Sequence, residues 1–411
     1  MFFDKNPLIV QKFGGTSLAN ISYISKVASA IKKETRTKKL VIVVSAMAGS
    51  TNQFIAKCME INVGKTDLAQ EAYDSAISSG ENLSAALLSL ALLKEGILAK
   101  TLQGWQIPIL TNDDFSKARI IKIDHDKILQ YVENGIIPVI CGFQGVTEKN
   151  SITTLGRGGS DTTAVAVAAA IKAQSCEIYT DVSGVFSADP RLVPKALKIE
   201  SISYEEMLCF AMYGAKVLER RSVEIAMRYK VPLKVIKTNS HNPGTNVIQK
   251  QSTHMESCEI KGISLKNDII FCQIQTSTHR DLYALMEALI KVTCFNLIVD
   301  YNENTCKFEA PLSENTKINA IVQNKKLVSS YMVDTQSALV VIVGWSIGET
   351  CDLLIKVWKE LNRNQVKIQN ITSDTHCIKI KVSLNQGDTI VKQLHKALIE
   401  GDANTHEQLG T

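Results

Sequence analysis

The sequence predicts an α/β domain built on a largely parallel sheet between helices, followed by two small α+β domains. Short apolar runs alternate with helical patterns from Pro7 to about Thr238, which is typical of a parallel sheet. The segment 239–258 is polar and aperiodic and contains a Pro-Gly pair, so it fits a domain boundary. Beyond that boundary, the order strand, helix, strand, strand occurs twice, which indicates two small units of similar size.

Five short runs rich in apolar and β-branched residues are the predicted strands of the first domain. They are 8–13, 40–46, 136–143, 176–181 and 232–238. A helix is predicted from Ser160, because apolar side chains recur at the helical spacing i, i+3, i+4 and i+7. These are Ala164, Val167, Ala168 and Ile171.

The repeated pattern defines the expected C-terminal domains. The first repeat has strands at 268–275, 295–301 and 305–311 and a helix from about His279; the second has strands at 338–344, 367–374 and 376–383 and helices through 354–361 and 390–399. We therefore expect domains at 1–248, 259–335 and 336–401. The strand 259–265 belongs either to the first repeat or, with the first repeat inserted after it, to the second.

Composition excludes several classes of protein. Hydrophobic residues make up 45% and charged residues 21% of the 411 residues, as in an ordinary globular chain. The net charge of +5 is spread among interspersed acidic and basic residues, so a nucleic-acid partner is not expected. The ten cysteines form no C-x-x-C pair, which favours free thiols over disulfides or a zinc site. Asp4 interrupts the N-terminal stretch, and we expect no membrane span and a cytoplasmic location.

The first candidate motif is LIVQKFGGTSLAN, in which Lys12 precedes Gly14 and Gly15 at the end of a strand, and a helix follows near Asn20. Glycines allow close approach of a ligand to the backbone, free N–H groups attract anions, and the lysine adds a cation. A tight strand-to-helix turn with an incidental lysine explains this segment equally well.

The second candidate motif is LGRGGSD, with Arg157 between glycines and Gly158, Gly159, Ser160 and Asp161 at a helix start. Ser160 or Asp161 could act simply as a helix cap. Neither capping nor turning needs the arginine, whose guanidinium suits a carboxylate or a phosphate. The pattern therefore favours an anion site.

The third candidate motif is YTDVSGVFSADPRL. Thr180 and Asp181 close a strand, and Phe186 and Arg191 lie in the loop that follows. Ligands bind at the carboxyl ends of parallel strands, although the local sequence alone favours a surface loop with an Asp-Pro turn. The chain has no P-loop and no complete G-x-G-x-x-G; His279-Arg280-Asp281-Leu282 resembles a kinase catalytic loop only by accident, because no D-F-G follows.

Taken together, KFGGTS, LGRGGSD, YTDVSGVFSADPR and YGAKVLE resemble the aspartokinases of the amino acid kinase family, in order and in spacing. The resemblance covers most of residues 7–248, and the C-terminal repeats look like that family's paired ACT regulatory domains. It implies an amino acid kinase-like fold and transfer of the γ-phosphoryl group of ATP to L-aspartate, giving 4-phospho-L-aspartate. That reaction opens the lysine, threonine and methionine branch, and Mg²⁺ is expected to bind through the nucleotide's phosphates.

The resemblance also implies roles for single residues. Lys12 and Asp161 match catalytic positions, Asp161 as an organiser of charge, and Gly14, Gly15, Gly158 and Gly159 match the phosphate cradle. The expected aspartate site is Thr51, Glu81, Arg157 and Ser160; the expected ATP site is Lys12, Thr180, Asp181, Phe186, Arg191 and Lys216. No side chain is assigned as a direct metal ligand.

The chain departs from the family's usual pattern at a few places. Glu219-Arg220-Arg221 stand where His-Pro is usual, Phe186 lacks a tyrosine hydroxyl, and the first ACT-like unit is divergent. The expected effector is lysine, with threonine second, and the ACT-like units are expected to form a homodimer or a higher oligomer. The alternatives are a kinase acting on glutamate, N-acetylglutamate or a nucleoside monophosphate, or a non-catalytic amino-acid sensor.

Overall fold

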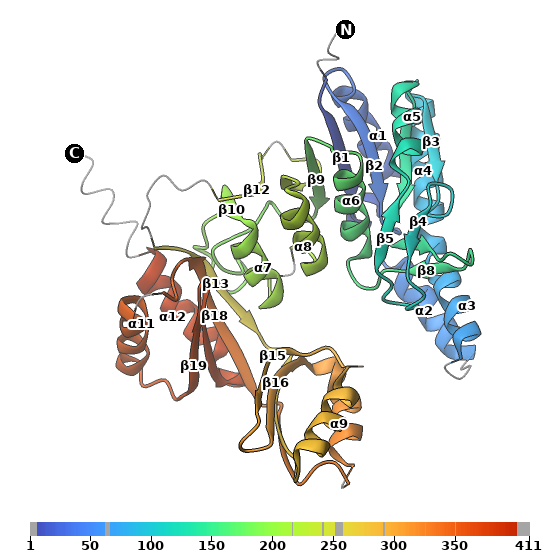
Figure 1. Ribbon diagram of the computed structural model, residues 1–411. Helices are drawn as coiled ribbons and strands as arrows, with labels where there is room; N and C mark the ends of the chain where they lie inside the picture. The colour runs from blue at the N-terminus through green and yellow to red at the C-terminus, as the bar shows by residue number, and fades with distance from the viewer. Residues whose placement is uncertain are drawn as a thin grey trace, which may run out of the picture. The chain divides into compact units, whose positions relative to one another are not determined.

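The structure is a computed structural model that describes residues 6–61, 66–215, 217–240, 242–250, 258–290, 292–324, 326–349 and 351–400. The chain forms two compact units (Figure 1). The first comprises Met1–Phe186, Lys198–Ala211 and Lys216–Thr253, and the second comprises Ser187–Leu197, Met212–Ala215 and His254–Thr411.

The first unit is built on an eight-stranded sheet in the order β10-β12-β11-β9-β1-β2-β6-β3. All neighbouring pairs are parallel except β11 and β12. The strands are β1 (Leu8–Phe13), β2 (Lys39–Val44), β3 (Ala99–Leu102), β6 (Ile137–Cys141), β9 (Ser175–Thr180), β10 (Ser201–Ser203), β11 (Leu233–Lys237) and β12 (Thr245–Ile248). The predicted parallel-rich sheet is confirmed, and all five predicted strands are part of it.

Helices cover both faces of this sheet, which explains why its central strands β2 and β6 are almost wholly apolar. On one face, α1 and α4 bury Ile24, Val27, Leu88 and Leu92 against β1, β2 and β6. On the other face, α6 packs against β1, β2 and β9, and α5 against β2 and β6. The helices of this unit are α1 (Ile21–Glu34), α2 (Ser50–Ile61), α3 (Asp67–Ile77), α4 (Ser79–Lys94), α5 (His125–Glu133), α6 (Gly159–Ala170), α7 (Tyr204–Met212) and α8 (Arg220–Tyr229).

A smaller sheet lies beside the main one and carries the chain into α6. Its order is β5-β4-β7-β8, with β4 (Ile109–Thr111), β5 (Ile120–Ile123), β7 (Gln144–Val146) and β8 (Ile152–Thr154). The hairpin formed by β7 and β8 leads directly into the glycine-rich segment 156–159. The helix that follows is buried on nearly all sides, because each of the residues 159–168 is buried.

The second unit holds two four-stranded antiparallel sheets, in agreement with the predicted pair of α+β units. One sheet has the order β13-β18-β20-β19, and the other β15-β16-β14-β17. The sheet that starts with β13 has the strands β13 (Glu259–Lys266), β18 (Ser337–Trp345), β19 (Ile368–Asp374) and β20 (Cys377–Ser383). Its helices are α11 (Cys351–Arg363), α12 (Gly387–His395) and a terminal π-helical turn (Lys396–Glu400). The other sheet has the strands β14 (Ile269–Gln275), β15 (Phe295–Asp300), β16 (Thr305–Pro311) and β17 (Ser330–Asp334), with the helices α9 (His279–Leu289) and α10 (Asn315–Val322).

The second unit differs in two ways from the predicted domains, each of which is a continuous segment of the chain. Strand β13 pairs with β18 along residues 259–266, so it belongs to the sheet of the second repeat, with the first repeat inserted between. In addition, residues 187–197 and 212–215, which precede position 248, lie in the second unit. The backbone explains this, because the Ile263 amide donates to the Ser187 carbonyl over 2.7 Å and Lys266 Nζ donates to the Met212 carbonyl over 2.7 Å.

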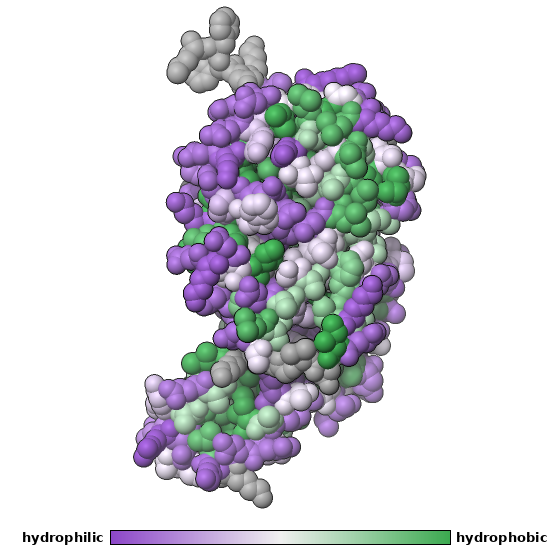
Figure 2. Space-filling view, turned by 90° about the vertical axis from the view of Figure 1, so that its right-hand side faces the viewer, coloured by the Kyte–Doolittle hydropathy of each residue, from purple (hydrophilic) through white to green (hydrophobic). Residues whose placement is uncertain are grey.

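One helical stretch of the described chain, Asp67–Lys94, is long and apolar enough to cross a membrane by length and composition alone. It consists of α3 and α4, and half of its most apolar window is buried inside the first unit. A core helix of a globular protein passes the same test, so this is weak evidence for a span. On the face drawn in Figure 2, apolar surface is interrupted by hydrophilic side chains.

Candidate active site

The site starts from an ion pair at the carboxyl edge of the main sheet. Lys12 lies near the end of β1, on the face opposite Ile9 and Phe13 because side chains alternate along a strand. Its Nζ atom lies 2.6 Å from a carboxylate oxygen of Asp161 in the first turn of α6, with side-chain exposures of 11% and 12%. Both charges are largely removed from bulk water, so each depends on the other for compensation.

The glycine-rich segment before α6 takes a backbone path that other residues would resist. Gly156 and Gly158 have φ values of +78° and +64°, in the left-handed region that favours glycine. A Cβ atom at Gly158 would also lie 2.4 Å from Cβ of Glu219. Gly158 itself is the N-cap of α6, without a side-chain cap bond, so the alternative that Ser160 or Asp161 caps this helix is wrong. The Gly159 and Asp161 amides donate to the carbonyl oxygens of Gly156 and Gly158 over 3.0 and 3.1 Å, and the remaining N–H groups of this helix start are available to an anion.

The first glycine pair packs just as tightly. The Gly14 amide donates to the Tyr179 carbonyl over 3.1 Å, which ties the turn after β1 to β9. A Cβ atom at Gly15 would lie 2.7 Å from the carbonyl oxygen of Ala46. Any larger residue would push this turn away from the end of β2. As predicted, a helix follows the turn, with Asn20 as the N-cap of α1.

Glu81, in the first turn of α4, adds a buried carboxylate. It is only 3% exposed, and one of its oxygens accepts a hydrogen bond of 2.9 Å from the Ala46 amide. The other oxygen has no hydrogen-bond partner among the described residues. Burial raises the pKa of this carboxyl to about 7, against a smaller opposing effect of the Ala46 amide. A cation that reached the free oxygen would find a strong acceptor there.

These groups face one pocket of about 230 Å³. Its lining residues are Lys12, Ser45, Ala46, Thr51, Glu81, Phe143, Gly156, Arg157, Gly158, Gly159, Ser160 and Asp161. The structure thus brings together every residue predicted for the aspartate site, both predicted catalytic residues and half of the predicted cradle. Two cations, two carboxylates and a helix N-terminus around one small cavity suit a ligand that carries charges of both signs.

Four lining residues were not predicted: Ser45, Ala46, Phe143 and Gly156. Ser45 and Ala46 directly follow β2, and Phe143 follows β6 with a φ of +69°. Their place after the ends of two parallel strands was a usable signal, because ligands collect at that edge.

A buried carboxylate outside the pocket holds its glycine-rich wall in place. Asp74 of α3 is fully buried and accepts four hydrogen bonds, two from Ser116 and two from Thr154, over 2.7 to 3.0 Å. Thr154 is the last residue of β8, and only Leu155 separates it from the glycine-rich segment. Nothing in the sequence around Asp74 distinguishes it from a solvent-exposed helix residue.

The segment Glu219-Arg220-Arg221, which stands where the family usually has His-Pro, also supports the glycine-rich wall of the pocket. Arg221 of α8 donates hydrogen bonds to the carbonyl oxygens of Leu155 (2.6 Å) and Ala118 (2.9 Å). Burial raises the pKa of Glu219, and the nearby Asp161 carboxylate raises it further. Arg221 thereby fixes the residue that enters the glycine-rich segment.

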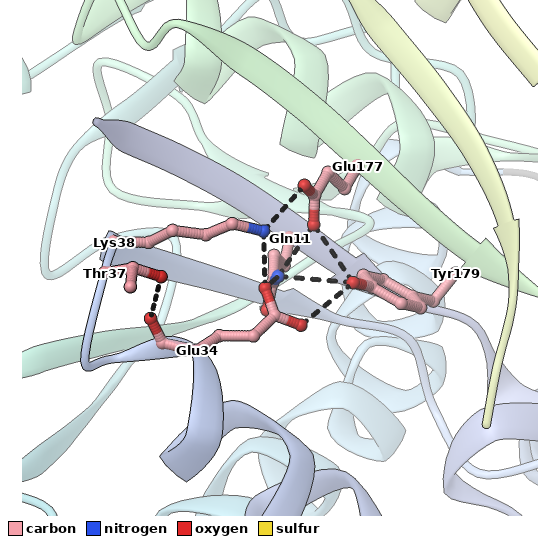
Figure 3. A network of polar contacts seen from close by, with 6 residues as sticks. All are labelled: Gln11, Glu34, Thr37, Lys38, Glu177 and Tyr179. Carbon is pink, nitrogen blue, oxygen red and sulfur yellow. Dashed lines mark hydrogen bonds and ion pairs between the residues drawn. The ribbon is translucent and has the colours of Figure 1, made fainter. Parts of the chain in front are cut away.

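Behind Lys12, on the other face of the sheet, a polar network joins β1, β9 and α1 (Figure 3). The Gln11 amide donates to both Glu34 and Glu177 over 2.8 Å, and Lys38 Nζ contacts the same two carboxylates at 2.6 and 3.1 Å. Tyr179 completes the network through its hydroxyl, 3.0 Å from Glu177. Residues 11 and 12 are adjacent, so this network fixes the strand that carries Lys12.

Apart from Lys12, the predicted nucleotide residues are not among the residues that line the pocket. Thr180 ends β9, next to β1, and its hydroxyl donates to the exposed Asp181 over 3.1 Å. Phe186 forms an isolated bridge with Lys198. Arg191 belongs to the second unit and forms a bidentate contact with Asp189, with a shortest distance of 2.6 Å. Lys216 lies outside the described residues. The nucleotide-binding roles of Thr180, Asp181, Phe186, Arg191 and Lys216 stay predictions.

Comparison with known proteins agrees with this geometry. The model of the amino acid kinase family matches residues 7–237. The aspartokinase of Rickettsia felis is 37% identical over 391 residues, covering 93% of this chain and 96% of the relative, and an aspartate kinase of Pseudomonas putida is 39% identical over 405 residues, covering 95% and 97%.

Among solved structures, the chain shares its fold with E. coli aspartokinase III in complex with aspartate and ADP, at a TM-score of 0.80 and 22% identity, covering 95% of this chain and 99% of the other. The resemblance read from the motifs is confirmed. The chain belongs to the amino acid kinase family and, within it, to the aspartokinases, which are ATP-dependent kinases.

Proposed function

We propose that this protein transfers the γ-phosphoryl group of ATP to the side-chain carboxylate of L-aspartate, forming 4-phospho-L-aspartate and ADP. The observation that carries the proposal is the single pocket that holds Lys12, Asp161, Glu81 and Arg157. Relatives that this chain matches over nearly its whole length are named aspartokinases.

The pocket suits an amino acid with two carboxylates. The free oxygen of Glu81 is positioned to accept hydrogen bonds from the α-ammonium group, and Arg157 can pair with a carboxylate in a two-point contact. Thr51 and Ser160 add hydroxyls to the same wall. A substrate held by its α-ammonium group presents its side-chain carboxylate toward Lys12.

The chemistry then needs no general base. A carboxylate with an ordinary pKa near 3.9 is already an anionic nucleophile at neutral pH. Asp161 is engaged with Lys12 at 2.6 Å, so it orders the lysine rather than accepting a proton. The contribution of the protein is to position the reactants in line and to stabilise the charge on the transferring group through Lys12 and the amides before α6.

The residues present also fit a magnesium ion bound mainly through nucleotide phosphates. Mg²⁺ is commonly held by one or two carboxylates together with substrate phosphates, and Asp161 is the carboxylate next to the glycine-rich segment. Within the described residues there is no group of three or more His, Cys, Asp or Glu that could hold a metal ion. When bound, the ion would neutralise charge on the β- and γ-phosphates.

The test is incubation of the protein with MgATP, hydroxylamine and single acidic amino acids, with separate readouts of hydroxamate and ADP. We expect hydroxamate from L-aspartate and none from glutamate or N-acetylglutamate. Hydroxamate from one of those two instead would reassign the substrate. ADP release without any hydroxamate would exclude a carboxylate acceptor, and neither product would favour an amino-acid sensor.

We also propose that the second unit makes the activity responsive to lysine and forms a homodimer in the cytoplasm. E. coli aspartokinase III has been solved with lysine and aspartate, and its fold is shared at a TM-score of 0.72. Strand β19 is an edge strand with mostly exposed residues, which leaves backbone groups free to pair with another strand. Lysine should lower the initial rate of the kinase reaction and raise the melting temperature of the protein. A lysine titration that changes neither quantity contradicts the proposed regulation. A monomer in light scattering contradicts the proposed homodimer.

A further inference from the structure

One aromatic side chain interrupts the polar lining of the pocket in the candidate active site, named here the amino-acid pocket. Among the described residues that line it, Phe143 is the only one with a large apolar side chain. The others are charged, carry a hydroxyl group, or are glycine or alanine. Phe143 is half-buried, at the boundary between the protein and the cavity. The binding of charged groups does not account for a ring in this place.

The backbone of Phe143 is strained, and hydrogen bonds hold it on both sides. Its φ value is +69°, in the left-handed region that bulky residues rarely adopt. The Phe143 amide donates to Oγ1 of Thr163 over 3.1 Å, and the Phe143 carbonyl oxygen accepts from the Leu155 amide over 2.9 Å. Strain of this kind persists only where the surrounding structure fixes it, and it is common at ligand sites.

The ring of Phe143 lies against the glycine-rich start of α6. A Cβ atom at Gly159 would lie 2.8 Å from Cδ2 of the Phe143 ring and 3.2 Å from the Phe143 Cα atom. Thr163, which accepts from the Phe143 amide, donates its own hydroxyl hydrogen to the Gly159 carbonyl over 3.0 Å. The ring and the first turn of α6 therefore hold each other in place, and the ring cannot move toward α6 without displacing it.

The sheet places Phe143 on the side of the amino-acid pocket opposite Lys12. Strand β2 lies between β1 and β6, and the register aligns Lys12 with Val43 and Val43 with Ile140. Neighbouring strands are about 4.8 Å apart, so β1 and β6 are about 10 Å apart. Phe143 follows the end of β6, and residues that follow β2 line the space between. The pocket therefore extends from Lys12, across the end of β2, to the ring of Phe143.

From this arrangement we propose that Phe143 is a specificity-determining residue, which limits the length of the acidic amino acid that the pocket accepts. The inference rests on the proposed kinase function, in which the side-chain carboxylate of the substrate faces Lys12. The α-carbon of the substrate then lies on the β6 side of that carboxylate. Each further methylene group between the two moves the α-carbon toward the ring of Phe143.

Aspartate and glutamate differ in this respect by a single methylene group. The one methylene of aspartate leaves its α-carbon short of the ring, whereas the second methylene of glutamate requires space that the ring occupies. One methylene group changes selectivity in an apolar pocket by about tenfold to two-hundredfold. Removal of the ring should therefore favour glutamate relative to aspartate, while a loss of fold would weaken the binding of both.

The test measures the dissociation constants of L-aspartate and L-glutamate by titration calorimetry, for the wild type and for Phe143→Ala in the full chain. The wild type should bind L-aspartate at least about tenfold more tightly than L-glutamate, and Phe143→Ala should reduce this ratio at least about fivefold.

Phe54→Ala is the matched control. Phe54 is also half-buried, and its ring lies 3.2 Å from the position of a Cβ atom at Gly80 in the first turn of α4. This packing is like that of Phe143 on α6, yet Phe54 is not among the described residues that line the amino-acid pocket. The control should lower the melting temperature and leave the ratio of the two dissociation constants unchanged.

Other outcomes overturn the inference. An unchanged ratio in folded Phe143→Ala, or an equal reduction in the control, would leave Phe143 with a structural role at the start of α6 only. If Phe143→Ala does not fold, Phe143→Leu shortens the side chain and should reduce the ratio in the same direction; an unchanged ratio there refutes the proposal. A wild-type protein without kinase activity on any acidic amino acid would instead refute the proposed function.

Discussion

The Nζ atom of Lys12 lies 2.6 Å from a carboxylate oxygen of Asp161, and this contact joins the end of β1 to the first turn of α6. The two elements are separated by nearly 150 positions in the sequence. The ion pair opens onto the amino-acid pocket instead of being sealed in the core. A buried ion pair adds little net stability by itself, so its position at the carboxyl edge of the sheet is better explained by phosphoryl transfer.

Replacing Lys12 with alanine should lower kcat at least about a hundredfold with the fold retained, because a preorganised donor is lost where charge develops. The control is Lys38→Ala, which removes a lysine that also contacts two carboxylates, but on the opposite face of the sheet (Figure 3). Steady-state kinetics with circular dichroism as a folding check distinguishes the two. Near-normal turnover of the Lys12 variant would remove this residue from the mechanism.

Gly158→Ala should strongly reduce activity, because the new Cβ atom would meet Glu219 at 2.4 Å and move the start of α6. Gly135→Ala is the matched control, since Gly135 has a similar φ of +70° and open space around it. Left-handed strain alone costs about 1 kcal/mol, so the control should lose only stability. Equal catalytic losses in both variants would show that strain, and not the position of the cradle, accounts for the effect.

Much of the fold could be predicted, because several central strands are nearly continuous apolar runs. The runs at 40–46 and 136–143 correspond to β2 and β6, since strands buried on both faces need nearly uninterrupted apolar sequence. The strands β3, β10 and β12 were not predicted. They have only three or four residues, too few for a period to be visible, and their pairing depends on tertiary contacts.

The candidate site was predictable where side chains carry its chemistry, and not where the backbone does. Lys12 and Asp161 were identifiable by residue type within motifs, and Glu81 was assigned only through the resemblance to the family. Ala46 contributes to the wall of the pocket and, through its amide, to the hydrogen bonding of Glu81, and alanine gives no sign of this in a sequence. The loop 187–197 could not be assigned to the second unit either, because its attachment depends on buried contacts with His395 and β13.

Asp74→Ala should lower the free energy of unfolding by about 3 kcal/mol, because the buried amides of Ser116 and Thr154 would lose a charged acceptor. Asp74→Asn keeps the shape and one acceptor oxygen, so its loss should be smaller. Urea unfolding at constant m-value measures both. If the alanine variant is as stable as the wild type, the wall of the pocket does not depend on Asp74.

The raised pKa of Glu81, about 7, predicts a pH-dependent affinity for the amino acid. Only the ionised carboxylate attracts an ammonium group strongly, so kcat/KM for aspartate should rise between pH 6 and pH 8. Glu81→Gln should remove this rise and lower kcat/KM about tenfold to a hundredfold at pH 8, the loss expected for a charged hydrogen bond. A flat profile for the wild type would mean that Glu81 does not titrate in this range or does not contact the substrate.

The same carboxyl predicts how stability depends on pH in the absence of substrate. Burial raises the folded-state pKa of Glu81 above its ordinary value of 4.5, so the native protein binds this proton more tightly than the unfolded chain. The stability that the group contributes is therefore fully present below pH 4.5 and is lost as the pH rises to about 7, by roughly 3 kcal/mol in total. The measurable quantity is the difference in free energy of unfolding between the wild type and Glu81→Gln, in which all other titrating groups cancel. This difference should shift against the wild type across that window and stay constant above pH 8; a difference that is constant from pH 4.5 to pH 8 would show that Glu81 is solvated and keeps an ordinary pKa.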